Sequence, residues 1–216
     1  MTPEEWDLTL HSVKEVAAAG KKVTILVDAA YIDFAGDAAE SRQFLPKLDD
    51  LPESILVVVA YSLSKTFTLY GMRCGAAIAM TKSKAIADEF KRVCEFSSRG
   101  SWSNCTRPAM TVLANVYADP VLLAQVDRER EVYRNMLRSR GRAFEDAARQ
   151  AGLPIVPYDA GFFASIPCAT ADVVSEKLQK DDIFLVPFAK GLRVTVAAIS
   201  EEKCKAIPEK VLQAMQ

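Results

Sequence analysis

The stretch SILVVVAYSLSKTFTLYGMRCGAAIAM, residues 54–80, contains two apolar runs separated by a polar segment. The first run is rich in β-branched residues and carries no charge, which is typical of a strand buried on both faces. Residues 75–80 form the second run, and KVTILVD at residues 22–28 is a third. Polar or helical segments separate the runs, which favours an α/β sheet whose ligands bind at the carboxyl ends of its strands. Asp28 and Lys65 both lie at such an end.

The first helix is predicted from its caps. TPEEW at the start combines a capping Thr2, a proline suited to the first turn, and Glu5 as the second partner of a capping box. Trp6 and the apolar residues that follow it at helical spacing form one face, and Gly20 ends the helix. The chain therefore opens with a helix that leads into the strand at residues 22–28.

A long helix is expected in the second half of the chain. After a break at Asp119-Pro120, apolar residues recur at spacings of three, four or seven in a charge-rich segment, which predicts one connecting helix. Beyond Gly152, short strands (GFFASIP, IFLVP and LRVTVAAI) alternate with helices expected over residues 171–179 and 200–216. Pro208 is expected to kink or restart the last helix. This part is predicted to be a second, small α/β unit.

The composition is that of a globular protein with a sizeable core and balanced charge. Apolar residues make up 50% of the chain, and 27 basic residues face 28 acidic ones, so nothing indicates a nucleic-acid surface or a polybasic membrane anchor. No apolar run approaches the roughly 20 residues that span a bilayer, and MTPEEWDL lacks the features of a signal peptide. We therefore expect a cytoplasmic protein that binds a small molecule, with no nucleic acid and no membrane among its partners.

The five cysteines form no CxxC pair, are odd in number and have apolar neighbours, so we expect buried free thiols and no metal site. They are Cys74, Cys94, Cys105, Cys168 and Cys204. The single histidine, His11, lies on the opening helix, which argues against histidine-based catalysis.

Several polar residues around the central stretch are candidates for chemistry. Ser62 and Lys65 form an S-x-x-K pattern, which in serine acyl-enzymes joins a nucleophile to a lysine, but the companion motifs S-D-N and K-T-G are absent. A lysine that leaves a buried strand can also be an ordinary exposed residue. Asp28 and Tyr31, in VDAAY, add a carboxylate and a phenol that could hold a heteroaromatic cofactor.

Six segments of the sequence resemble one family, in the family's order and with comparable spacing. They are TPEEW, DAAYIDFAG, SLSKTFTLYGMRCG, RGSWSN, AGFFASI and GLRVTVAAIS. The resemblance is to the class I, fold-type I aminotransferases that use pyridoxal 5'-phosphate (PLP), in the aspartate and aromatic aminotransferase branch. It covers essentially the whole chain. It implies transfer of an amino group from an amino acid to a 2-keto acid, with PLP as the cofactor, by a homodimer.

The resemblance assigns five residues to the cofactor. Lys65 is similar to the lysine that forms a Schiff base with PLP and then moves the α-proton of the substrate. Asp28 resembles the partner of the pyridine nitrogen, and Tyr31 resembles the phenol that donates to the ring oxygen. Ser62 and Arg73 match the phosphate ligands, and the planar guanidinium of arginine suits a phosphate dianion.

Two further arginines are expected to bind the substrate. Arg193 lies in an otherwise apolar strand, where an unpaired charge would be unfavourable and where the resemblance implies a substrate carboxylate. Arg99, in RGSWSN, aligns with the arginine that in the aspartate branch reaches into the neighbouring subunit's site for a second carboxylate. Trp102 and the NCT that ends at residue 106 differ from the family's usual Tyr and NPP, which argues against a dicarboxylate substrate.

The family's chains are about twice as long, so the resemblance implies the C-terminal half of such an enzyme. The expected fold is α/β, the C-terminal part of the PLP-dependent transferase fold. Residues 1–118 would belong to a large, mostly parallel-sheet domain, 119–150 to a connecting helix, and 151–216 to a small C-terminal domain. Two alternatives share most of these residues. One is another fold-type I enzyme, such as a lyase or a relative of aminocyclopropane carboxylate synthase, and the other is the ligand-sensing domain of an aminotransferase-like transcription regulator.

Overall fold

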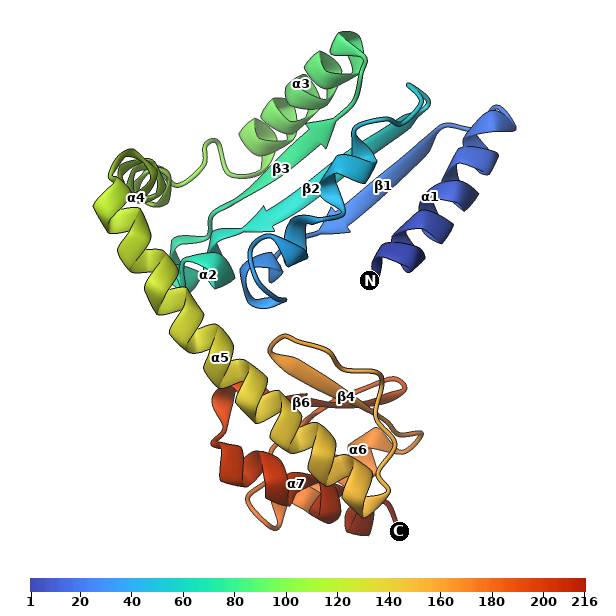
Figure 1. Cartoon of the computed structure of the whole chain (residues 1–216), viewed down its shortest axis with the longest axis vertical. Coiled ribbons are helices and arrows are strands. Elements are labelled where there is room, and N and C mark those ends of the chain that lie inside the picture. The colour runs from blue at the N-terminus through green and yellow to red at the C-terminus, as the bar shows by residue number, and fades with distance from the viewer. The chain divides into compact units, whose positions relative to one another are not determined.

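The computed structural model describes residues 1–216, which divide into two compact units, Met1–Val126 and Asp127–Gln216. Each unit has its own three-stranded sheet and its own buried core (Figure 1). The long helix α5 (Pro120–Ala151) begins in the first unit and continues into the second. The α/β class predicted from the sequence is confirmed in both units.

The strands of the first unit follow the order β1-β2-β3. Strand β1 (Val23–Asp28) pairs parallel to β2 (Ile55–Ser62), and β3 (Gly75–Met80) pairs antiparallel to β2 (Figure 1). All three apolar runs of the sequence therefore form strands. Strand β3 is antiparallel to β2 because the segment between them, residues 63–74, leaves and re-enters the sheet at the same end.

Helix α1 (Pro3–Ala18) covers one face of this sheet. Its predicted capping box is present, because Glu5 N donates to Thr2 Oγ1 at 3.2 Å and Thr2 N donates to Glu5 Oε2 at 2.7 Å. Leu10 on this helix is buried in one core with Val57 of β2. The apolar face of the first helix and the central strand thus bury each other, as the spacing predicted.

The opposite face of the sheet is open within this chain. In β1 the buried Val27 alternates with Leu26, whose side chain is 68% exposed. Strand β3 has no buried residue at all. The burial on both faces that is typical of such runs is therefore not completed for β1 and β3 by the elements of this chain.

Short and long helices complete the first unit. The short ones are η1 (Ile32–Phe34), η2 (Glu40–Arg42) and η3 (Leu45–Leu48) after β1, and α2 (Leu63–Thr66) and η4 (Tyr70–Met72) between β2 and β3. The long ones are α3 (Lys84–Ser101) and α4 (Arg107–Ala118). No single helix is both long and apolar enough to cross a membrane, although α4 and α5 pass such a test as a pair, bent by 104°.

The second unit is built on an antiparallel sheet of order β4-β6-β5. Its elements are β4 (Phe163–Pro167), α6 (Ala171–Gln179), β5 (Val186–Phe188), β6 (Gly191–Thr195), η5 (Val196–Ala198) and α7 (Glu201–Met215). Phe144 of α5 is fully buried in this core, together with Ile166, Leu192 and Val211. This unit therefore has its own hydrophobic core, and it combines residues 151–216 with most of α5.

Three details of this unit differ from the sequence prediction. The strand expected in IFLVP starts only at Val186, because Ile183 donates its backbone N–H to Leu178 O at 3.1 Å and so completes the end of α6. The strand expected in LRVTVAAI ends at Thr195 and continues as η5. Helix α7 does not restart at Pro208, since this proline is inside the helix and fully buried in the core.

Candidate active site

The carboxyl ends of β1 and β2 lie side by side, which brings Asp28 next to the segment that carries Lys65. In the parallel register Asp28 pairs with Ala60, two residues before Ser62 at the end of β2. Asp28 is exposed, and its Oδ1 accepts a hydrogen bond from Ala30 N at 3.0 Å, as in an Asx turn. One oxygen of the carboxylate thus fixes the turn, and the other is open to a ligand.

The segment between β2 and β3 leaves and re-enters the sheet at the same place. Ser62 pairs with Gly75 in the antiparallel register, and Leu63 N donates to Cys74 O at 3.1 Å. These bonds close residues 62–75 into a loop, which we call the lysine loop. Helix α2 begins the loop and contains Lys65. The loop therefore holds its polar side chains close to the end of β2.

Lys65 faces aromatic rings. Its Nζ lies 5.5 Å from the ring centroid of Tyr31, which follows β1, and 5.1 Å from that of Tyr70 in the lysine loop. The side chain is half-buried, and no hydrogen bond or ion pair holds its ammonium group. Lys65 and Tyr31, predicted to act at one site, are thus brought together by segments that follow different strands.

Arg73 stands near the end of the lysine loop. It adopts a left-handed conformation (φ +52°) and is exposed, and its Nη1 donates to Tyr70 O at 2.8 Å. A guanidinium carries five N–H donors, so several remain for an anion. Ser62, at the end of β2, is half-buried, and its side chain makes no capping bond to α2. Both predicted phosphate ligands thus belong to the lysine loop.

A buried carboxylate beside these residues was missed in the sequence. Asp33 is only 7% exposed; its Oδ1 pairs with Arg42, and its Oδ2 accepts a hydrogen bond from the Tyr61 hydroxyl at 3.2 Å. Tyr61 belongs to β2, so Asp33 ties the segment that carries Tyr31 to the strand that leads to Lys65. The signal for it is an Asp between the apolar residues of YIDF.

The two arginines assigned to the substrate lie apart from this group in the chain. Arg99, near the end of α3, is exposed and donates to Ser103 Oγ at 2.7 Å. Arg193, in β6 of the second unit, is also exposed, and its guanidinium lies 4.6 Å from the ring centroid of Phe163. The argument from a buried charge is therefore wrong for Arg193, because its side chain points out of the core of its own unit.

The cysteines differ in burial from the prediction. All five are free, but only Cys168 and Cys204 are buried, and Cys105 is exposed. Burial raises the pKa of the Cys204 thiol, against the influence of Arg140, which lowers it. No group of three or more His, Cys, Asp or Glu side chains is placed to hold a metal ion.

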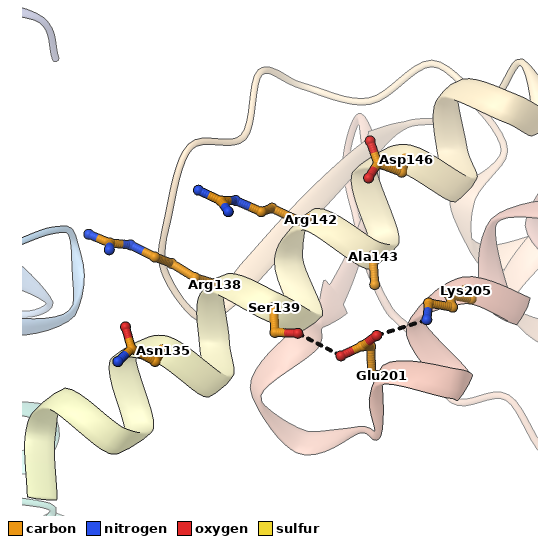
Figure 2. Close-up of a pocket in the computed structure, with 8 residues that line it drawn as sticks. All are labelled: Asn135, Arg138, Ser139, Arg142, Ala143, Asp146, Glu201 and Lys205. Carbon is orange, nitrogen blue, oxygen red and sulfur yellow. Dashed lines mark hydrogen bonds and ion pairs between the residues drawn. The ribbon is translucent and has the colours of Figure 1, made fainter.

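A polar pocket of about 510 Å³ lies between α5 and α7 in the second unit (Figure 2). Glu201 accepts hydrogen bonds from Ser139 at 2.6 Å and from Lys205 at 2.8 Å, while Arg138 and Arg142 project side by side from α5. The lining mixes cations with carboxylates and contains none of the residues assigned to the cofactor. Its interactions link the two helices, and we do not include it in the candidate active site.

Comparison with known proteins decides the family. The profile of the family described as "Aminotransferase class I and II" matches residues 6–211. This chain belongs to the class I and II aminotransferase family. The match includes both units and the whole lysine loop, so the resemblance inferred from six short segments is confirmed along nearly the full chain.

Individual aminotransferases resemble the chain over about half of their own length. The crystal structure of an aminotransferase from Anaerococcus prevotii is 38% identical, with a TM-score of 0.95, over 100% of this chain and 53% of that one. The tyrosine aminotransferase of Rhizobium meliloti is 29% identical over 91% of this chain and 50% of its own. An aromatic-amino-acid aminotransferase from Burkholderia pseudomallei, solved covalently bound to pyridoxal phosphate, shares the fold at 23% identity and a TM-score of 0.72, with 100% of this chain and 52% of that one covered.

Proposed function

We propose that this chain provides the lysine-bearing part of the active site of a PLP-dependent aminotransferase. The main support is that a carboxylate, an amine and a guanidinium occur on segments joined at one end of the β1-β2-β3 sheet. They belong to Asp28 at the end of β1, Lys65 in α2 and Arg73 in the lysine loop. Membership of the aminotransferase family supports the proposal independently.

The side chains present suit the three reactive parts of PLP. Asp28 has one carboxylate oxygen without a hydrogen bond, which suits a protonated pyridine nitrogen. Lys65 is half-buried and has no carboxylate partner, which suits an amine that must react with an aldehyde. Ser62 and Arg73 offer O–H and N–H donors for a phosphate. The ring of Tyr31 next to Lys65 suits a phenol that donates to the oxygen of the cofactor ring.

Bound PLP would supply an electron sink for the electron pair that remains when the substrate loses its α-proton. In this proposal Lys65 takes that proton and returns it at another carbon. The Asp28 carboxylate keeps the pyridine nitrogen protonated, since an anion next to a base favours its charged form. Ser62 and Arg73 fix the phosphate, and so the position of the ring relative to Lys65.

The proposed substrates are an amino acid and a 2-keto acid. Arg193 and Arg99 are both exposed, and each could bind a carboxylate in the bidentate manner that suits a guanidinium. The finer proposals are that the whole enzyme is a cytoplasmic homodimer and that Arg99 acts in the partner's site. An amino-donor and keto-acceptor panel separates the two arginines when Arg193→Gln and Arg99→Gln are made in the protein completed with the half of the fold that its relatives add. If Arg193 binds the carboxylate that all amino donors share, Arg193→Gln should lose activity with every donor. If Arg99 binds a second carboxylate, Arg99→Gln should lose activity only with dicarboxylates.

Reductive trapping tests the position of the cofactor on this chain. The chain is mixed with PLP and treated with borohydride, and the labelled peptides are identified by mass spectrometry. We expect the label on Lys65, its loss in Lys65→Ala, and its persistence in Lys82→Ala, which removes an exposed lysine that pairs with Asp50. Labelling spread over the exposed lysines, without preference for Lys65, would contradict the proposal.

The alternative functions predict different products. The assay uses the chain mixed with, or fused to, the half of the fold that its relatives add, taken for example from the Anaerococcus prevotii protein; we call this the complemented protein. Formation of an amino acid from the keto acceptor supports transamination. Release of ammonia would favour a lyase, and ligand binding without turnover would favour a regulator.

A further inference from the structure

Two tyrosine rings face the ammonium group of Lys65 from different segments. Tyr31 follows β1, and Tyr70 lies in η4 of the lysine loop, with the ring centroids 5.5 and 5.1 Å from Nζ. Both distances are within the roughly 6 Å at which a cation is attracted to the face of an aromatic ring. No carboxylate pairs with Lys65, and these two rings are the groups that face its charge.

The backbone of Tyr70 is held in place by the same loop. Arg73 Nη1 donates to Tyr70 O at 2.8 Å, and Met72 N donates to Leu69 O at 3.2 Å. Leu69 N in turn donates to Leu63 O at 3.3 Å, at the start of α2. The ring of Tyr70 is 48% exposed, so the hydrophobic core does not account for its placement.

We propose that Tyr70 is a positioning residue for Lys65. Together with Tyr31 it forms a two-ring cradle that fixes the ammonium without an ion pair; the functional meaning of this inference rests on the proposed function. A carboxylate in contact would bind the ammonium by a directional, charge-assisted hydrogen bond, which must break before the amine can attack a carbonyl carbon. A ring face restrains the position of the nitrogen by a weaker, non-directional attraction, so the ammonium gives up its proton and exposes its lone pair more readily than one that is paired with a carboxylate.

Nuclear magnetic resonance tests the cradle directly. Formaldehyde and cyanoborohydride convert each lysine amine to a dimethylamine: the amine condenses with formaldehyde and releases water, and the reductant supplies hydride. With ¹³C-formaldehyde each lysine gives a methyl signal and keeps its charge. We expect the Lys65 signal, assigned with Lys65→Arg, to be shifted upfield of the exposed lysines by the ring currents of Tyr31 and Tyr70. Tyr70→Leu should move it towards those lysines, and Tyr70→Phe should leave it in place.

A matched control distinguishes a specific effect of Tyr70 on Lys65 from a general loss of structure in the first unit. Tyr117 is another exposed tyrosine of the first unit, with its ring against Phe67 at 6.2 Å, and Tyr117→Leu should not move the Lys65 signal. A Lys65 signal that coincides with those of the exposed lysines in the unaltered chain would overturn the cradle. So would a signal that Tyr70→Leu leaves unchanged.

The effect on reactivity is read by trapping with PLP and borohydride. Tyr70→Leu should slow the labelling of Lys65 by about two- to fivefold, because the amine is then no longer held at one position relative to the groups that bind PLP, and this loss outweighs the easier deprotonation of an ammonium without the ring. Tyr70→Phe should keep the normal rate, and an equal or faster rate in Tyr70→Leu would overturn the positioning role. The failure of the cradle and the failure of the proposed function can be distinguished. A shifted Lys65 signal without PLP labelling would support the cradle and contradict the proposed function. PLP labelling of Lys65 without a shifted signal would support the proposed function and contradict the cradle.

Discussion

At the residue scale, the groups of the candidate site are fixed through the backbone and through aromatic rings. Asp28 is held by Ala30 N, and Arg73 is held by Tyr70 O. The positions of Asp28 and Lys65 at the carboxyl ends of strands could be predicted from the sequence because each follows an apolar run. Tyr70 and Asp33 could not, because their roles depend on contacts between segments that the fold brings together.

The role of the negative charge of Asp28 can be tested with a substitution that keeps the size of the side chain. Asp28→Asn should keep the PLP label on Lys65 but lower turnover of the complemented protein by on the order of 100-fold or more, the scale on which a preorganised charge contributes to a rate. The neutral amide does not hold the pyridine nitrogen protonated. Asp50→Asn, at an exposed site paired with Lys82, serves as the control. Unaltered turnover in Asp28→Asn would remove this residue from the mechanism.

Gly75 permits the close approach that shapes the base of the lysine loop. A Cβ at this position would lie 2.5 Å from the Tyr61 carbonyl oxygen, which is backbone and so moves only with β2. We expect Gly75→Ala to lower the free energy of unfolding by about 1–3 kcal/mol, as overpacking does elsewhere. Gly71→Ala, where nothing lies within 4 Å of the added atom, should change it far less. Urea unfolding of the two variants gives the comparison, and equal stabilities would contradict the steric argument.

At the element scale, most helices and strands could be predicted because their signals are local. The capping box at Thr2 and the break at Asp119 are each contained within a few residues. The boundaries that failed depend on backbone bonds that the sequence pattern does not reveal. Strand β6 ends at Thr195, after which Ala197 N donates to Phe162 O at 3.4 Å, and β5 starts only at Val186 because Ile183 N still donates to Leu178 O at the end of α6. Neither bond is visible in the local sequence.

Helix α7 carries a pH-sensitive link to α5. Hydrogen bonds from Lys205 and then from Ser139 hold the pKa of Glu201 below its usual value of 4.5. Because the folded state favours the carboxylate, this link stabilises the protein above about pH 4.5, where Glu is ionised in the unfolded chain, and its contribution is lost as the pH falls through the folded pKa. Glu201→Gln should therefore lower the melting temperature more at pH 7 than at pH 3.

The neighbouring carboxylate provides the control for this link. Glu202 lies in the same first turn of α7 and is exposed, without the hydrogen bonds that Glu201 receives. Glu202→Gln should leave the melting temperature nearly unchanged at both pH values. A Glu201→Gln effect of the same size at pH 3 and pH 7 would show that the carboxylate charge is not what links the helices.

At the scale of the whole molecule, the two units differ in how completely they bury their apolar residues. The sheet of the second unit is packed against α5, α6 and α7, and Phe144, Ile166 and Leu192 are fully buried. In the first unit Leu26 is exposed on the sheet. Helix α3 has no buried residue, and even its Phe96 is 83% exposed. The chain spans about half the length of the aminotransferases that it matches.

This difference predicts how the 216-residue chain behaves alone. A cofactor site requires several elements to be positioned together, and here only the groups around the lysine loop are supplied, so the chain should show no appreciable transaminase activity when mixed with PLP, an amino acid and a keto acid. Its open apolar surface should cause self-association in light scattering. Leu26→Thr should reduce that association, whereas Val173→Thr, at a 54% exposed site of the second unit, should not.

The complemented protein provides the decisive comparison, because the added half would cover the open face of the β1-β2-β3 sheet. If the open face of the sheet needs this cover, complementation should suppress self-association and restore turnover together. Leu26→Lys should prevent both effects, because it would place an unpaired cation in the new core. Amide hydrogen exchange should then show β1 and β3 protected only in the complemented protein, while β4 and β6 are protected in either form. Robust turnover by a monomeric 216-residue chain would show instead that the residues of the lysine loop and its neighbours suffice.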